Sequence, residues 1–78
     1  MNNKMIEIKS EQLKIFIREH RFTQKEFAHD VLNTSENYLA RRMSKGIISK
    51  LWIFQIANYF EISLNSLTEY LTGEVVRL

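Results

Sequence analysis

Side chains between residues 35 and 45 are of the types that hydrogen-bond to the edges of DNA bases. Asn can pair bidentately with adenine, and Arg can pair in the same way with guanine. If this stretch is helical, at about 3.6 residues per turn, Leu39 and Met43 lie on its apolar face. The opposite face then carries Asn37, Arg41 and Ser44, with Tyr38, Ala40 and Lys45 at its margins. Such a face could read bases in the major groove of duplex DNA.

The positive charge of the chain is concentrated at the same place. The net charge is only +2 at pH 7, but residues 37–50 hold four basic side chains and no acidic one. Residues 51–78 hold three acidic side chains against one basic side chain. A local positive field of this kind favours DNA phosphates as partners, although an ordinary solvated helix face can have the same composition.

A second group of polar side chains opens the preceding helix. Gln24 lies where a phosphate would approach a helix N-terminus, whose free N–H groups attract anions. In the later stretch, Arg41 is expected to read a base, whereas Lys45 and Lys50 are expected to neutralise phosphates. The candidate DNA-binding residues are Gln24, Lys25, Ser35, Glu36, Asn37, Tyr38, Arg41, Arg42, Ser44, Lys45 and Lys50.

Caps and glycines delimit the predicted helices. Thr23 as an N-cap places Glu26 at the third helical position, which completes a capping box, and Phe22 and Phe27 flank it as a hydrophobic staple. Other expected N-caps are Ser10, either Thr34 or Ser35, Ser49 and Ser63, and the expected helix ends are Asn33, Gly46 and Gly73. The predicted helices span residues 11–20, 24–32, 35–45, 50–60 and 64–72. The side chains expected to be buried are Phe16, Phe27, Ala28, Leu39, Phe54, Ala57, Phe60 and Leu67.

These elements predict an all-α fold, a compact five-helix domain. The helices at 24–32 and 35–45 are joined by a short turn, and the small Ala28 allows them to approach closely, as in a helix-turn-helix. A chain of 78 residues leaves room for one domain, residues 1–78, with a core at about residues 10–73. The segments 5–8 and 74–78 are short and apolar, and whether they form strands stays open.

Three motifs resemble the Cro and phage-repressor type of helix-turn-helix family, also called the xenobiotic-response-element family. They are FTQKEFA at 22–28, SENYL at 35–39 and IANYFEISLNSL at 56–67. The resemblance covers residues 13–72 and implies a lambda-repressor-like fold. It also implies that Gln24 contacts the DNA backbone and that the exposed side of residues 35–45 reads bases. Residues 28–46 are one or two positions longer than the family pattern, and Ile17 stands where many members carry Arg, with Arg18 following.

Other function classes have weaker support in the sequence. No enzyme is expected, because His20, His29, Asp30 and scattered glutamates form no catalytic or zinc-ligand pattern, and neither a cofactor nor a metal nor a small-molecule ligand is expected. The chain has no cysteine, no membrane-spanning apolar run and no signal-peptide pattern, so a cytoplasmic protein is expected. The alternative to a DNA-binding transcriptional regulator, expected to be a repressor, is a small helical protein-interaction module of the antirepressor or antitoxin kind.

The expected partners are double-stranded DNA and a second copy of the chain. One recognition helix reads only a few base pairs, so a two-fold homodimer on an operator with inverted half-sites is predicted. The expected dimer surface is the helix at 64–72 with the tail, whose apolar side chains are Tyr70, Val75, Val76 and Leu78.

Overall fold

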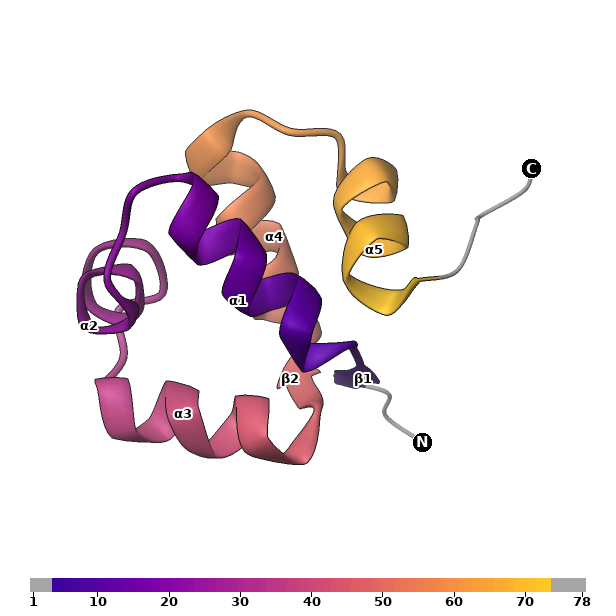
Figure 1. Cartoon of the computed structure of the whole chain (residues 1–78). Helices are drawn as coiled ribbons and strands as arrows, with labels where there is room; N and C mark the ends of the chain where they lie inside the picture. The colour runs from indigo at the N-terminus through magenta and orange to yellow at the C-terminus, as the bar shows by residue number, and fades with distance from the viewer. Residues whose placement is uncertain (1–3, 74–78) are drawn as a thin grey trace.

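The computed structural model describes residues 4–73, which form five helices and two short strands. The helices are α1 (Ser10–Glu19), α2 (Gln24–Glu26) continuing directly into the π-helical turn η1 (Phe27–Val31), α3 (Glu36–Lys45), α4 (Lys50–Phe60) and α5 (Leu64–Thr72). The strands are β1 (Met5–Glu7) and β2 (Ile47–Ser49). In Figure 1, α3 runs along the bottom, α1 passes in front of α4, and α5 lies to one side. The predicted helix bounds agree with these to within one residue.

The predicted capping box at Thr23 is confirmed. The Thr23 hydroxyl accepts a hydrogen bond from the Glu26 N–H at 3.1 Å, and the Glu26 carboxylate accepts one from the Thr23 N–H at 2.9 Å. The rings of Phe22 and Phe27 meet edge to face, with centroids 5.7 Å apart, as a hydrophobic staple requires. These local contacts fix where the second helix begins.

The remaining caps follow the sequence with one exception. Ser35, Ser49 and Ser63 each accept a backbone N–H of the following turn, and Gly46, Gly73 and Asn33 adopt the left-handed conformation at or just after helix ends. Ser10, however, is not an N-cap. Lys9 occupies that position without a side-chain bond, and the Ser10 hydroxyl instead donates to the Met43 carbonyl of α3. A tertiary partner therefore replaces the local cap that the sequence indicated.

The second helix is only partly an α-helix. After the first turn, the Leu32 N–H bonds to the Phe27 carbonyl at 3.2 Å, five residues back, and the Thr34 N–H bonds to the Ala28 carbonyl at 2.9 Å. A π-helical turn holds more residues than an α turn. The π-helical turn therefore takes up more residues between Ala28 and α3 than an α turn would, and Ser35 remains the N-cap of α3.

The prediction of an all-α fold is corrected by a small antiparallel sheet. Strands β1 and β2 pair with Ile6 opposite Ile48, and Ile48 is fully buried. The sequence left open whether the segment at residues 5–8 forms a strand, and residues 5–7 do form one. Strand β2 was not predicted. The reason is that residues 47–49 become a strand only through pairing with residues some 40 positions earlier in the chain. The sheet lies at the edge of a mostly helical domain (Figure 1).

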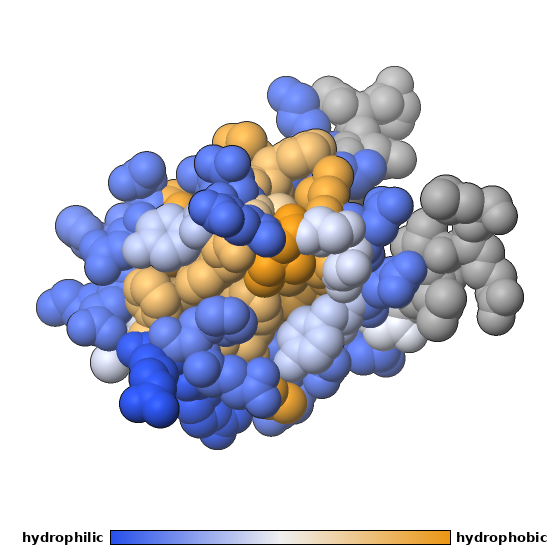
Figure 2. Space-filling model, turned by 90° about the horizontal axis from the view of Figure 1, so that it is seen from above, coloured by the Kyte–Doolittle hydropathy of each residue, from blue (hydrophilic) through white to orange (hydrophobic). Residues whose placement is uncertain are grey.

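The core confirms most of the expected buried residues. Phe16, Phe27, Ala28, Leu39, Ala57 and Leu67 are buried, and Phe60 is half-buried between other aromatic rings. Phe54 is an error of prediction, because it is 55% exposed. Trp52, Ile53 and Ile56 occupy the inner face of α4, which turns Phe54 and Leu51 outward. The face of the molecule turned away from α3 also shows apolar surface between polar side chains (Figure 2).

Candidate nucleic-acid interface

Helix α3 presents a polar face to solvent, as its spacing predicted. Leu39 and Met43 are buried, and they fasten the helix to the core. Asn37, Arg41 and Ser44 are exposed on the other side, together with Lys45. The Ser35 hydroxyl is engaged as the N-cap, accepting from the Tyr38 N–H at 3.1 Å, and Glu36 is exposed beside it. Amide, guanidinium, hydroxyl and ammonium groups therefore share one side of a single helix.

An aromatic contact orders the middle of this face. The Arg41 guanidinium lies over the Tyr38 ring, 5.9 Å from its centroid. The Tyr38 ring in turn meets the buried Trp52 ring edge to face, with centroids 5.7 Å apart. A cation held over an aromatic face gains about 0.5–1 kcal/mol at exposed sites. The most central basic side chain of α3 is thereby linked to the core through Tyr38.

Arg42 has a different position from the other predicted residues. Its side chain is half-buried, and its Nε–H donates to the Ile47 carbonyl at 3.1 Å. This bond ties the end of α3 to β2. Arg42 thus serves the local structure, and the exposed stripe does not include it.

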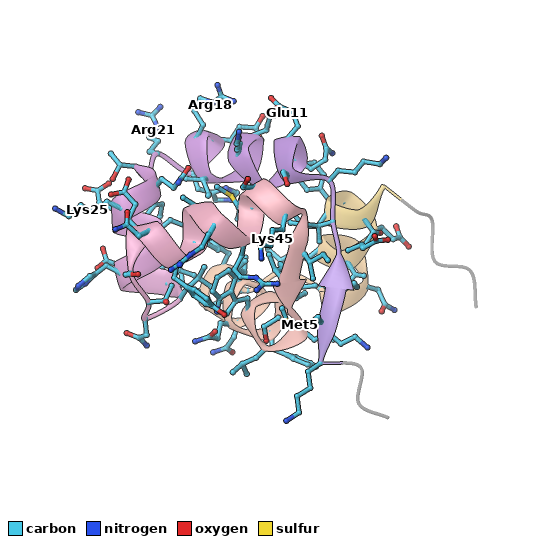
Figure 3. The ribbon with its side chains drawn as sticks, turned by 90° about the horizontal axis from the view of Figure 1, so that it is seen from below. Met5, Glu11, Arg18, Arg21, Lys25 and Lys45 are labelled. Atoms are coloured by element: carbon cyan, nitrogen blue, oxygen red, sulfur yellow. The ribbon has the colours of Figure 1, made fainter. Side chains whose placement is uncertain are left out.

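A cleft beside Gln24 contains two basic residues that the sequence analysis did not select. Lys14 and Arg18 of α1 line this cleft, of about 250 Å³, together with Gln24. Lys14 and Arg18 are four residues apart on the exposed side of α1, and that spacing was the available signal. Lys25, the residue of α2 after Gln24, is also exposed (Figure 3).

At the C-terminal end of α3, Lys45 and Lys50 line a groove beside β1. Figure 3 views the face on which α3 lies, with Lys25 of α2 at the left edge, Lys45 near the centre and Met5 of β1 below Lys45. Of the predicted basic residues, Lys45 and Lys50 therefore lie at the C-terminal end of α3, Lys25 lies on α2, and the exposed Arg41 belongs to the polar stripe.

Residues 4–73 contain little that would suit a catalytic or metal-binding site. His29 and Asp30 are both exposed, and the described part of the chain contains no group of three or more His, Asp or Glu side chains placed to hold a metal. None of the described helices has the length and apolar character needed to cross a membrane.

Comparison with known proteins identifies no relative of this chain. No family model, no curated protein and no solved structure matches this chain. The resemblance to the Cro and phage-repressor family therefore stays a prediction from the sequence motifs, and the candidate interface rests on the residues and geometry of the chain itself.

Proposed function

We propose that this chain is a sequence-specific double-stranded DNA-binding protein that regulates transcription in the cytoplasm, acting as a repressor. In this proposal α2 with η1 and α3 form a lambda-repressor-like helix-turn-helix, and α3 enters the major groove. The observation that carries the proposal is the exposed stripe of Asn37, Arg41 and Ser44 on a helix whose other side is anchored in the core.

The dimensions of α3 are compatible with this role. Its ten residues make a helix about 15 Å long, and the major groove of B-DNA is about 12 Å wide. A helix of this length lying in the groove brings both of its ends close to the phosphate backbones. Lys45, in the last turn of α3, and Lys50 just beyond it lie at one of these ends, where phosphates would pass.

Each group then has a distinct task. Arg41 and Asn37 pair with base edges, because they lie on the outward stripe of α3. Gln24 and Lys25, with Lys14 and Arg18, contact the backbone on the α1 and α2 side of the molecule. Lys45 and Lys50 contact it at the C-terminal end of α3.

We further propose that the protein binds an inverted-repeat operator as a two-fold homodimer through α5 and the tail. Of the predicted dimer residues, Val75, Val76 and Leu78 lie outside the described residues. Tyr70 is half-buried, with its ring 6.3 Å from that of Phe16. The only predicted dimer residue within α5 is therefore the half-buried Tyr70, and the proposal depends mainly on residues 74–78.

The direct test is selection of bound duplexes from a random DNA pool with purified protein, followed by a salt titration on the selected sequence. A DNA-binding protein should enrich a defined motif, and its affinity should fall steeply as salt rises, because bound phosphates release counterions. Failure to enrich any motif, with no salt-dependent binding to any duplex, would contradict the proposal.

A second candidate is a protein-interaction module, and one observation favours it. Leu51 and Phe54 are 62% and 55% exposed on neighbouring turns of α4, and exposed apolar surface often marks a contact with another protein. Capture of a partner that is insensitive to salt and abolished by Phe54→Asp would support this candidate. The acid-free segment at residues 37–50 favours DNA.

A further inference from the structure

A basic groove lies between strand β1 and the C-terminal end of α3. It has a volume of about 740 Å³, and its lining includes Lys9, Lys45 and Lys50. These lysines come from three separate parts of the chain, and all three are exposed. One acidic side chain, Glu7 of β1, lines the same groove. The groove is therefore a second concentration of positive charge, which the run of residues 37–50 reveals only in part.

Backbone hydrogen bonds hold this groove together. The Ile8 N–H bonds to the Gly46 carbonyl at 2.8 Å, and the Lys50 N–H bonds to the Lys4 carbonyl at 2.8 Å. The Lys9 N–H bonds to the Leu71 carbonyl at 2.7 Å, and the Lys9 side chain passes so close to Gly73 that a Cβ there would collide with it. The lysines thus project from a fixed framework, which lowers the entropy lost when they bind a ligand.

The position of the groove suggests its ligand. If α3 lies in the major groove, as proposed above, the helix is longer than the groove is wide and a phosphate backbone passes its C-terminal end. That end leads through Gly46 directly into the groove. The groove is open to solvent, and its lysines lie just before α1 (Lys9), at the end of α3 (Lys45) and at the start of α4 (Lys50), a spread that suits an extended polyanion better than a single small anion.

We propose that this groove binds the phosphodiester backbone of one DNA strand beyond the C-terminal end of α3. Lys9, Lys45 and Lys50 supply the cations, and Glu7 opposes them and limits the affinity. Strand β1 is then a DNA-contacting element as well as a structural one. This inference rests on the proposed DNA-binding function and adds to it a defined path for one strand.

The sharpest test is a substitution expected to strengthen binding, because loss of folding cannot mimic it. Glu7→Gln should bind the selected duplex about twofold more tightly at about 0.1 M salt, since it removes a negative charge near the phosphates. Glu61→Gln is the matched control. It makes the same change of net charge at an exposed residue after α4, on the part of the fold away from α3 (Figure 1), and its affinity should stay at the wild-type value.

Lys9→Gln is the complementary variant, because it should lose one phosphate contact. One phosphate contact contributes about −0.9 to the slope of log affinity against log salt. A salt increase from about 50 to 200 mM should therefore weaken this variant about threefold less than the wild type. On a duplex shortened at the flank next to α3's C-terminal end, the wild type and both groove variants should bind alike.

The possible failures are distinguishable. If wild-type protein shows no salt-dependent binding to any duplex, the proposed function fails. If it binds a selected duplex but Glu7→Gln matches Glu61→Gln, and Lys9→Gln keeps the wild-type salt slope, the function stands and the groove is overturned. Equal effects of the variants on the full and shortened duplexes would also overturn it.

Discussion

At the scale of single residues, position relative to the core separates side chains of the same type. Arg41 and Arg42 are adjacent, yet Arg41 is exposed over the Tyr38 ring and Arg42 is committed to the Ile47 carbonyl. A lysine at the end of α3, Lys45, is exposed beside the basic groove. Substitutions of these three basic residues should therefore affect DNA binding and stability differently.

Arg41→Ala should reduce affinity for the selected duplex by roughly 1–3 kcal/mol and relax the preference at one base pair. Lys45→Ala should instead weaken binding to all sequences alike and reduce the salt slope by about 1, because it loses a phosphate contact. Binding to single-base variants of the selected duplex across a salt series measures both effects. A uniform loss by Arg41→Ala on specific and random duplexes would show that Arg41 does not read a base.

The residue scale also tests the capping box. Thr23→Ala removes the acceptor of the Glu26 N–H, and the loss of an N-cap costs about 1 kcal/mol of folding free energy. Urea unfolding followed by circular dichroism should show a lower midpoint with an unchanged slope. Thr23→Ser keeps a hydroxyl in place and should retain most of the stability, so equal losses in the two variants would contradict a capping role.

At the scale of elements, short segments depend on their neighbours for their form. Strand β2 is three residues long and has one fully buried side chain, Ile48, which pairs with Ile6 of β1. The same strand receives the Arg42 hydrogen bond and leads into the Ser49 cap of α4. Strand β2 therefore joins the end of α3 to the start of α4, and the burial of Ile48 should contribute to the free energy of unfolding.

Ile48→Ala should destabilise the fold by about 2–5 kcal/mol, because it leaves a cavity at a fully buried position. Leu51→Ala, at a residue that is 62% exposed, is the control and should cost less than about 0.5 kcal/mol. Denaturant titrations of both variants give the two free energies of unfolding. Similar small values for both would mean that the sheet packs less tightly than its burial indicates.

At the scale of the whole molecule, the polar stripe and the exposed apolar residues Leu51 and Phe54 lie on different helices. Leu51 and Phe54 are exposed on α4, whereas the stripe lies on α3. The dimer proposed through α5 and the tail would have to leave both copies of α3 free for DNA.

Deletion of residues 74–78 should weaken dimerisation and operator affinity while leaving the helical content unchanged, if the tail completes the dimer surface. Sedimentation at micromolar concentration measures the first effect, and footprinting should show two protected half-sites with centres about 10 base pairs apart for the full chain. A full-length chain that sediments as a monomer and protects a single half-site would exclude the dimer. If instead Phe54→Asp alone dissociates the dimer, the interface lies on α4.

The sequence by itself determined the features that act within a few residues. Local caps fix the starts of α2, α3, α4 and α5, which the sequence predicted to within one residue: Thr23 with Glu26, Ser35, Ser49 and Ser63. The orientation of α3 followed from the spacing of Leu39 and Met43, which decides which side chains face solvent. Local hydrogen bonds and helical periodicity need no knowledge of distant residues.

Only the tertiary structure decided the features that depend on partners far along the chain. Pairing across some 40 residues made residues 47–49 a strand, and the Met43 carbonyl drew Ser10 away from its expected cap. The crowded inner face of α4 turned Phe54 to the surface, and the approach of β1 to α3 brought Lys9, Lys45 and Lys50 to one groove. The physical reason is that long-range contacts compete with local preferences, and their free energy is absent from any short window of sequence.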